Sequence, residues 1–229
     1  MAAASLAQGL TGFGFGIVAM AGLTPVVGPY TASLIVTPLA GANVCIALWD
    51  TRRHIHWRRV LPLWAGGAVG VPVGVQLLLH TDPLVLRRLV GVVILITAAS
   101  TFWRTFPMGA AAPHAWGVLA GFAGGVLGGS VSMSGPPVVW YTYRQPWPLD
   151  SIRATLLLYF AGTIAQRFVM LAASGAYTPP MARHVVVLLP IVVAGTLVGS
   201  RLVRRTRRRQ VDVVVAVLLV MAGVRLLLA

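Results

Sequence analysis

The sequence contains no lysine, no glutamate and a single cysteine, Cys45, and its acidic residues are limited to Asp50, Asp82, Asp150 and Asp212. A lone cysteine forms neither a disulfide framework nor a cysteine metal site, so we expect no metal and no cofactor. None of the aspartates lies in the middle of an apolar segment. The chain therefore lacks the carboxylates from which proton relays and cation sites in membranes are built.

Charged residues of any kind are scarce. They make up 10% of the 229 residues, whereas 58% are hydrophobic and the mean hydropathy is +0.86. An average soluble domain is about one quarter charged. Apolar stretches long enough to cross a hydrocarbon core of about 30 Å recur along the whole chain. The composition predicts an all-α integral membrane protein without a separate soluble domain.

Arginine accounts for nearly all of the charge that is present and gives the chain a net charge of +14. The arginines gather in short connections between apolar segments, above all at 51–59 and 201–209. Cytoplasmic loops of membrane proteins carry such an excess of positive charge. We therefore place both loops in the cytoplasm and expect no nucleic-acid partner.

Hydropathy divides the chain into about eight apolar segments. These cover 5–29, 31–49, 60–79, 84–103, 114–143, 153–173, 185–203 and 211–228. Eight full crossings would put the two arginine loops on opposite sides of the membrane. The segment 114–143 is too short for two crossings and is interrupted by glycine and proline. We predict that it is a re-entrant helical hairpin, which returns both loops to the cytoplasm.

A weak internal repeat divides the single membrane domain, 1–229, into halves at 1–108 and 113–229. The glycine-rich stretch at 9–16 resembles that at 125–129, and Leu61-Pro62 resembles Leu189-Pro190. Each half is predicted to hold one broken or re-entrant hairpin and three transmembrane helices. Because the number of crossings per half is odd, the two repeats are expected to have inverted topology, as in many secondary transporters.

The two glycine-rich motifs read GLTGFGFGIVAMAGLTP, from Gly9 to Pro25, and GFAGGVLGGSVSMSGPPVVWY, from Gly121 to Tyr141. With these motifs the chain resembles the sulfite exporter TauE/SafE family of membrane permeases. The resemblance implies a multi-pass permease of the bacterial inner membrane that exports sulfite, sulfonates or related organic anions. The chain departs from the family's run of three glycines in both motifs, which leaves the substrate open.

The first candidate site residues lie where a broken helix would leave backbone N–H groups unpaired, since such groups can hold an anion. They are Gly12, Gly14, Gly16, Gly128, Gly129, Ser130, Ser132 and Ser134. Close helix packing is an equal alternative for the glycines. Hydrogen bonding to their own helix is the alternative for the serines.

Three polar residues inside apolar segments complete the candidate site. Asn43 and Thr163 lie at comparable depth in the two halves, where they can contact a ligand or form interhelical hydrogen bonds. Arg167 lies well inside an apolar segment without an acidic neighbour in sequence. An intramembrane charge is costly and usually functional, so we predict that Arg167 neutralises a bound anion. The alternative is that its side chain extends to the membrane interface.

We predict a permease for small anions, whose partners are the anion and the lipid bilayer, with a homodimer left open. An anion leaving a negative interior gains about 2.3 kcal/mol per charge per 100 mV, which favours export without a coupling ion. A non-transporting membrane subunit is the alternative. It predicts a dry core, whereas a permease predicts a wet cavity reached by Asn43, Thr163, Ser132 and Arg167. An integral membrane enzyme is less favoured, because no nucleophile with a base is evident.

Overall fold

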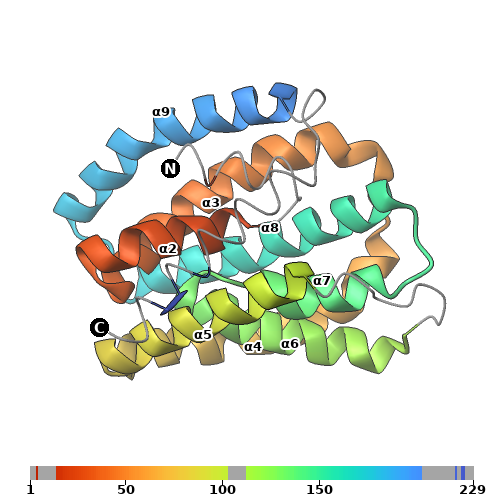
Figure 1. Ribbon diagram of the computed structural model, residues 1–229, viewed down its shortest axis with the longest axis horizontal. Coiled ribbons are helices and arrows are strands. Elements are labelled where there is room, and N and C mark those ends of the chain that lie inside the picture. The colour runs from red at the N-terminus through yellow and green to blue at the C-terminus, as the bar shows by residue number, and fades with distance from the viewer. Residues whose placement is uncertain (1–3, 5–13, 103–111, 203–219, 221–222, 225–229) are drawn as a thin grey trace.

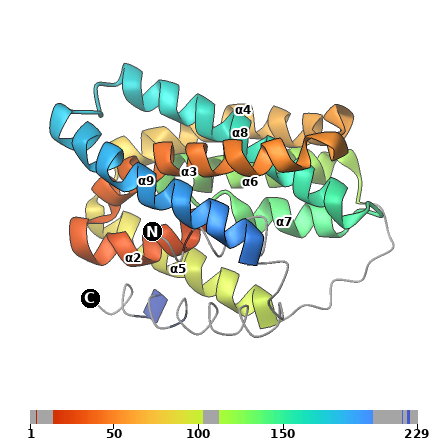
Figure 2. The ribbon, with the colours of Figure 1, turned by 90° about the horizontal axis from the view of Figure 1, so that it is seen from above.

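The computed structural model describes residues 4, 14–102, 112–202, 220 and 223–224. Its regular structure in these residues is helical, as predicted (Figure 1). The elements are α2 (Phe15–Val27), α3 (Pro29–Thr51), the short 3-10 helix η1 (Arg52–His54), α4 (Trp57–His80), α5 (Pro83–Phe102), α6 (His114–Val131), α7 (Gly135–Tyr143), α8 (Leu149–Ala173) and α9 (Pro179–Leu202). The long helices α3, α4, α6 and α8 run side by side, and α9 packs on α3 (Figure 2).

Three stretches of helix in the described residues are long and apolar enough to cross a membrane: Pro29–His54, Trp57–His80 and Leu149–Ala173. Apolar side chains also cover parts of the outer surface, for example Val169 and Val186, which are about two thirds exposed. Such side chains suit a lipid environment, so the structure agrees with a membrane protein. The eight-segment count and the inverted repeat stay predictions, because 5–13 and most of 211–228 lie outside the described residues.

The predicted hairpin at 114–143 is a helix broken at residues 132–134, hereafter the break. Ser132 adopts a left-handed conformation (φ 60°, ψ 28°), and the N–H groups of Ser132 and Met133 donate to carbonyls in the last turn of α6. This pattern ends a helix and satisfies its terminal carbonyls. The chain then returns as α7. Gln145 Nε2 donates to the carbonyl of Ala112 at 2.9 Å, so the hairpin enters and leaves at one end of the molecule.

The connections at 51–57, 112–113 and 144–148 all lie at this same end, hereafter the arginine-rich end (Figure 1). The guanidinium of Arg59 lies over the Trp147 ring, 5.0 Å from its centroid, and joins two of these connections. The connections around Gly28, at 81–82 and at 174–178 lie at the opposite end. Of the two arginine loops predicted to share one side of the membrane, 51–59 lies at this end, while most of 201–209 lies outside the described residues.

Helices α4 and α6 pack closely through glycines. A Cβ atom on Gly70 would lie 2.3 Å from the carbonyl oxygen of Phe122, and one on Gly121 would lie 2.1 Å from that of Leu63. A Cβ on Gly129 would likewise lie 2.5 Å from the Val71 oxygen. Small residues that let two backbones approach are typical of helix pairs in membranes. The contacts of Gly129 are therefore those of close helix packing. The packing of α4 against α6 fixes the end of α6, where the break begins.

Candidate functional site

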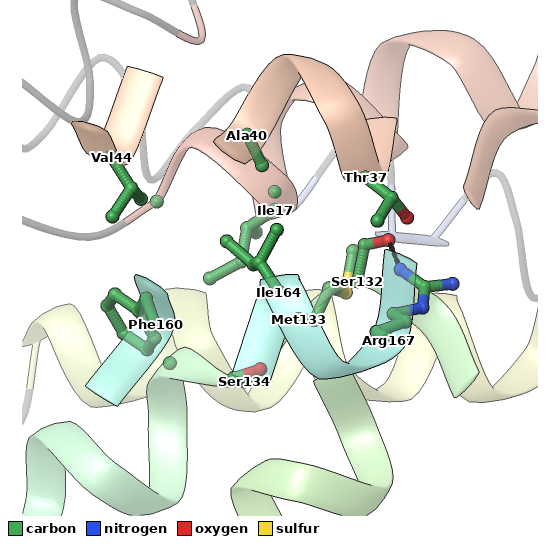
Figure 3. A pocket seen from close by; sticks show the side chains of 13 residues that line it. Ile17, Thr37, Ala40, Val44, Ser132, Met133, Ser134, Phe160, Ile164 and Arg167 are labelled. Carbon is green, nitrogen blue, oxygen red and sulfur yellow. Dashed lines mark hydrogen bonds between the residues drawn. The ribbon is translucent and has the colours of Figure 1, made fainter. Parts of the chain in front are cut away.

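A pocket lies beside the break and has a volume of about 50 Å³ (Figure 3). One water needs roughly 10–15 Å³ of such space, so the pocket has room for a few waters or a small ion. Its walls come from the start of α2, the middle of α3, the break and α8. The lining residues are Gly14, Gly16, Ile17, Thr37, Ala40, Val44, Ser132, Met133, Ser134, Gly135, Phe160, Ile164 and Arg167.

Arg167 of α8 supplies the charge in this pocket. Its side chain is only 2% exposed and does not extend to the surface. One guanidinium nitrogen, Nη1, donates to Ser132 Oγ (Figure 3). The other, Nη2, donates to Ser33 Oγ at 2.5 Å. The Nε atom is buried and has no hydrogen-bond partner. The guanidinium is thus bound by neutral hydroxyls and keeps an unused donor.

No ion pair to Arg167 is present in the part of the chain that the structure describes. The aspartates in this part all lie near helix ends: Asp50 in the last turn of α3, Asp82 between α4 and α5, and Asp150 in the first turn of α8. Burying a charge without an opposite charge costs several kcal/mol. The pocket is therefore electrostatically suited to an anion and unsuited to a cation.

Ser33 was not identified from the sequence. It is fully buried, donates from Oγ to the carbonyl of Ser130 at 3.1 Å, and accepts from Ser132 Oγ at its own carbonyl at 3.2 Å. These contacts join α3 to the break and hold both serines beside Arg167. The available signal was the pair Ser33 and Thr37, which lie one turn apart on α3 and put two hydroxyls on one helix face.

Helix N-termini contribute partial positive charge to the same pocket. Gly14 directly precedes α2 and has a φ of 115°, a backbone conformation that favours glycine. Gly14 and Gly16 both line the pocket. A Cβ atom on Gly16 would lie 2.1 Å from the carbonyl oxygen of Ser132, so α2 begins directly against the break. Ser134 and Gly135 place the start of α7 at the pocket as well, but Pro136 and Pro137 in this first turn have no N–H group to donate. Unpaired N–H groups at helix starts attract anions.

The structure therefore brings Gly14, Gly16, Ser132, Ser134 and Arg167 together around one pocket, from the positions predicted as a site. Gly12 lies outside the described residues. The other predicted residues do not line the pocket. They are Asn43, Gly128, Gly129, Ser130 and Thr163. Of the four residues expected to reach the cavity of a permease, Ser132 and Arg167 line this pocket, and Asn43 and Thr163 do not.

The contacts of these other residues follow the packing alternatives. Asn43 is buried and donates from Nδ2 to Thr196 Oγ1 of α9 at 2.8 Å. Thr163 and Ser130 donate to carbonyls of their own helices, at 3.0 and 2.7 Å respectively. Gly128 faces the side chain of Ser134, and a Cβ atom there would overlap the hydroxyl. These residues shape the surroundings of the pocket without contacting its interior.

No group of three or more side chains suited to a metal ion occurs among the described residues. Cys45, the one cysteine in the sequence, is exposed on α3. The pocket itself offers a guanidinium and hydroxyls, which are hydrogen-bond donors to an anion and not metal ligands.

Comparison with known proteins identifies the family of the chain. The family model of the sulfite exporter TauE/SafE matches residues 1–226. The chain is 32% identical over 202 residues to the probable sulfite/organosulfonate exporter TauE of Cupriavidus necator. The aligned region covers 85% of this chain and 78% of that protein. No solved structure matches the chain. The match over nearly the whole length, together with the helical fold, shows that the chain belongs to the sulfite exporter TauE/SafE family of membrane transport proteins.

Proposed function

We propose that this protein is a multi-pass permease that exports small sulfur oxyanions, sulfite and organosulfonates, across the bacterial inner membrane. The observation that carries the proposal is the buried guanidinium of Arg167, which has hydroxyl partners and no carboxylate among the described residues. Sulfur oxyanions present several oxygens that accept hydrogen bonds, and a guanidinium offers a fork of donors that matches them. In this proposal the anion binds between Arg167 and the break.

In this proposal the anion enters from the arginine-rich end. Along α3, the lining residues Thr37, Ala40 and Val44 lead from Arg167 toward Thr51, where that end begins. Exposed arginines at this end raise the local concentration of anions by long-range attraction. If this end faces the cytoplasm, the membrane potential then drives the bound anion outward by about 2.3 kcal/mol per charge per 100 mV.

The proposal is tested by sulfite efflux from proteoliposomes under an imposed potential. We compare the wild type with Arg167→Gln and with Arg88→Gln, which removes an exposed charge on α5 that does not line the pocket. A hydrogen bond to a charged group contributes about 1.5–3 kcal/mol, so Arg167→Gln should slow efflux at least about tenfold. Arg88→Gln should match the wild type.

Two outcomes contradict the proposal. Equal efflux in the wild type and Arg167→Gln would mean that the anion does not bind beside the guanidinium. If the wild type moves no sulfur oxyanion in either direction, a non-transporting membrane subunit becomes the better interpretation, since such a protein needs the same helix packing but no flux.

A further inference from the structure

The pocket beside the break lies much closer to the opposite end of the molecule than to the arginine-rich end. On α3 and α8, the lining residues nearest to the opposite end are Thr37 and Arg167. Ala173, the last residue of α8, lies about 9 Å along the helix axis from Arg167 at 1.5 Å per residue. In the other direction, Thr51 at the end of α3 lies about 21 Å from Thr37. The layer that closes the pocket toward the opposite end is therefore thin.

Tyr177, in the connection between α8 and α9, belongs to this layer. Gly175 ends α8 in a left-handed conformation, with a φ of 72°. The N–H of Ala176 donates to the carbonyl of Leu171 at 3.1 Å, a pattern that closes a helix and turns the chain back. The ring of Tyr177 packs on that of Phe168, with 5.2 Å between the ring centroids. The turn thus returns Tyr177 to the level of the residue that follows Arg167.

The phenol of Tyr177 reaches across to α3. Its hydroxyl donates to the carbonyl of Leu34 at 3.3 Å, and Leu34 directly follows Ser33, the partner of Arg167 Nη2. Burial raises the pKa of Tyr177, whereas the charge of Arg167 and the side chain of Thr37 lower it. The phenol therefore lies close to both residues at which the pocket ends, and it joins the connection after α8 to α3.

The phenol can move without disturbing the core. Tyr177 is half-buried, whereas Leu171, which also lies in this layer, is fully buried. Ser174 and Gly175 are exposed, and a Cβ atom on Gly175 would meet nothing within 4 Å. One neutral hydrogen bond shifts an equilibrium by only about two- to tenfold. The hydroxyl of Tyr177 can therefore be released from α3 more easily than any fully buried side chain of the layer.

We propose that Tyr177 closes the exit from the anion site. While its hydroxyl is bonded to Leu34, an anion beside Arg167 is separated from the opposite end, and the anion leaves when the phenol moves aside. The inference rests on the proposed function, because the site that is closed is the one assigned to the anion. It adds the residue that controls release.

The test measures access from outside the cell to a thiol placed in the pocket. In a Cys45→Ser background, Thr37→Cys puts the thiol at the last lining position of α3, and an anionic, membrane-impermeant methanethiosulfonate is added to intact cells. Labelling should be slow with the native tyrosine. Tyr177→Ala should speed it at least about tenfold. Tyr177→Phe keeps the ring but loses the bond to Leu34, so it should speed labelling about two- to tenfold.

Two controls make the result specific. Ser174→Cys is exposed at the opposite end and should be labelled rapidly. If it is protected in cells, the same comparison is made in inverted membrane vesicles. Tyr143→Ala removes a half-buried tyrosine at the arginine-rich end and should leave labelling of Thr37→Cys slow.

Equal labelling rates with tyrosine, phenylalanine and alanine at position 177 would overturn the inference. The same increase in Tyr143→Ala would also overturn it, because a general loosening of the fold would then explain the access. The phenylalanine variant keeps the aromatic contact with Phe168, so the test does not depend on the folding of the alanine variant. Labelling needs no flux, so a failure of the proposed function appears separately, as absent efflux in the wild type.

Discussion

Arg167 carries a charge that the surrounding protein solvates but does not neutralise. Its hydroxyl partners, Ser33 and Ser132, replace part of the water that the guanidinium loses on burial. They do not remove the cost of transferring an ion into a medium of low dielectric constant, which is several kcal/mol. A buried residue that lowers stability in this way is typical of a functional site, where local rules of packing are broken.

Replacing Arg167 should therefore abolish the binding of sulfite without lowering the stability of the fold. In Arg167→Met the two serine hydroxyls still donate to the carbonyls of Ser130 and Ser33, while the buried charge is gone. We expect the midpoint of thermal unfolding of Arg167→Met to equal or exceed that of the wild type. Sulfite at about 100 times its Kd should stabilise the wild type by about 2.7 kcal/mol and leave the variant unchanged.

The measurement is thermal unfolding in detergent with and without sulfite, and Arg88→Met serves as the control for loss of an exposed arginine. This control should keep the full shift with sulfite. An Arg167→Met variant that is less stable than the wild type and still responds to sulfite would show that the guanidinium has a structural role only.

At the scale of elements, the start of α2 depends on the absence of a side chain at Gly16. A Cβ atom there would lie 2.1 Å from the Ser132 carbonyl oxygen, whereas one on Gly22 of the same helix would meet nothing within 4 Å. We expect Gly16→Ala to displace the break, lower the unfolding midpoint and slow sulfite efflux at least about tenfold, since overpacking costs about 1–3 kcal/mol.

Gly22→Ala is the matched control, because it makes the same chemical change on the same helix in open space. It should keep wild-type efflux and gain about 1 kcal/mol of helix stability. Both variants are measured in the same unfolding and efflux assays. Similar behaviour of the two would mean that the contact between α2 and the break is not required for transport.

Sequence reasoning identified the elements better than the contacts between them. The glycines and prolines of 114–143 predicted a broken helix, and the break lies directly before Gly135 and the two prolines, whereas the glycines of α6 stay within a regular helix. The isolated charge singled out Arg167. Ser33 was missed, because a serine in an apolar helix commonly bonds its own backbone. Its contacts with Ser132 and Arg167 join distant parts of the chain, and one sequence does not show which distant helices meet.

Helix rotation explains the different outcome for Asn43. Its position in the middle of an apolar segment predicted that Asn43 would contact the ligand. Adjacent residues on a helix point about 100° apart, and the lining residues Ala40 and Val44 lie on one face of α3. Asn43 therefore points to another neighbour, Thr196 of α9. Hydropathy gives the depth of a residue in the membrane but not its direction, which depends on the packing of neighbouring helices.

At the scale of the whole molecule, the distribution of loops predicts which residues face each side of the membrane. In a Cys45→Ser background, single cysteines are introduced at His54 and Pro146 of the arginine-rich end, and at Thr81 and Ser174 of the opposite end. Arginine-rich loops remain in the cytoplasm. A membrane-impermeant maleimide added to intact cells should thus label the second pair and leave the first unlabelled until the cells are opened.

Labelling of all four cysteines from outside would contradict the arrangement of ends in the structure. Labelling of the first pair alone would show that the arginine-rich end faces outward. The direction of potential-driven flux through the molecule would then be the opposite of the proposed one. The labelling pattern needs no transport, so it tests the topology independently of the substrate.

The serine contacts of Arg167 also bear on how long an anion stays. Ser33 and Ser132 already accept hydrogen bonds from the guanidinium, as the oxygens of an anion would. An incoming anion exchanges these bonds for its own, and a departing one leaves the guanidinium with partners at hand. The re-formed bonds offset part of the free energy of binding, so the anion is held less tightly and its residence time is shorter. We infer a carrier that turns over rapidly when its substrate is abundant, in contrast to a scavenger that holds trace amounts.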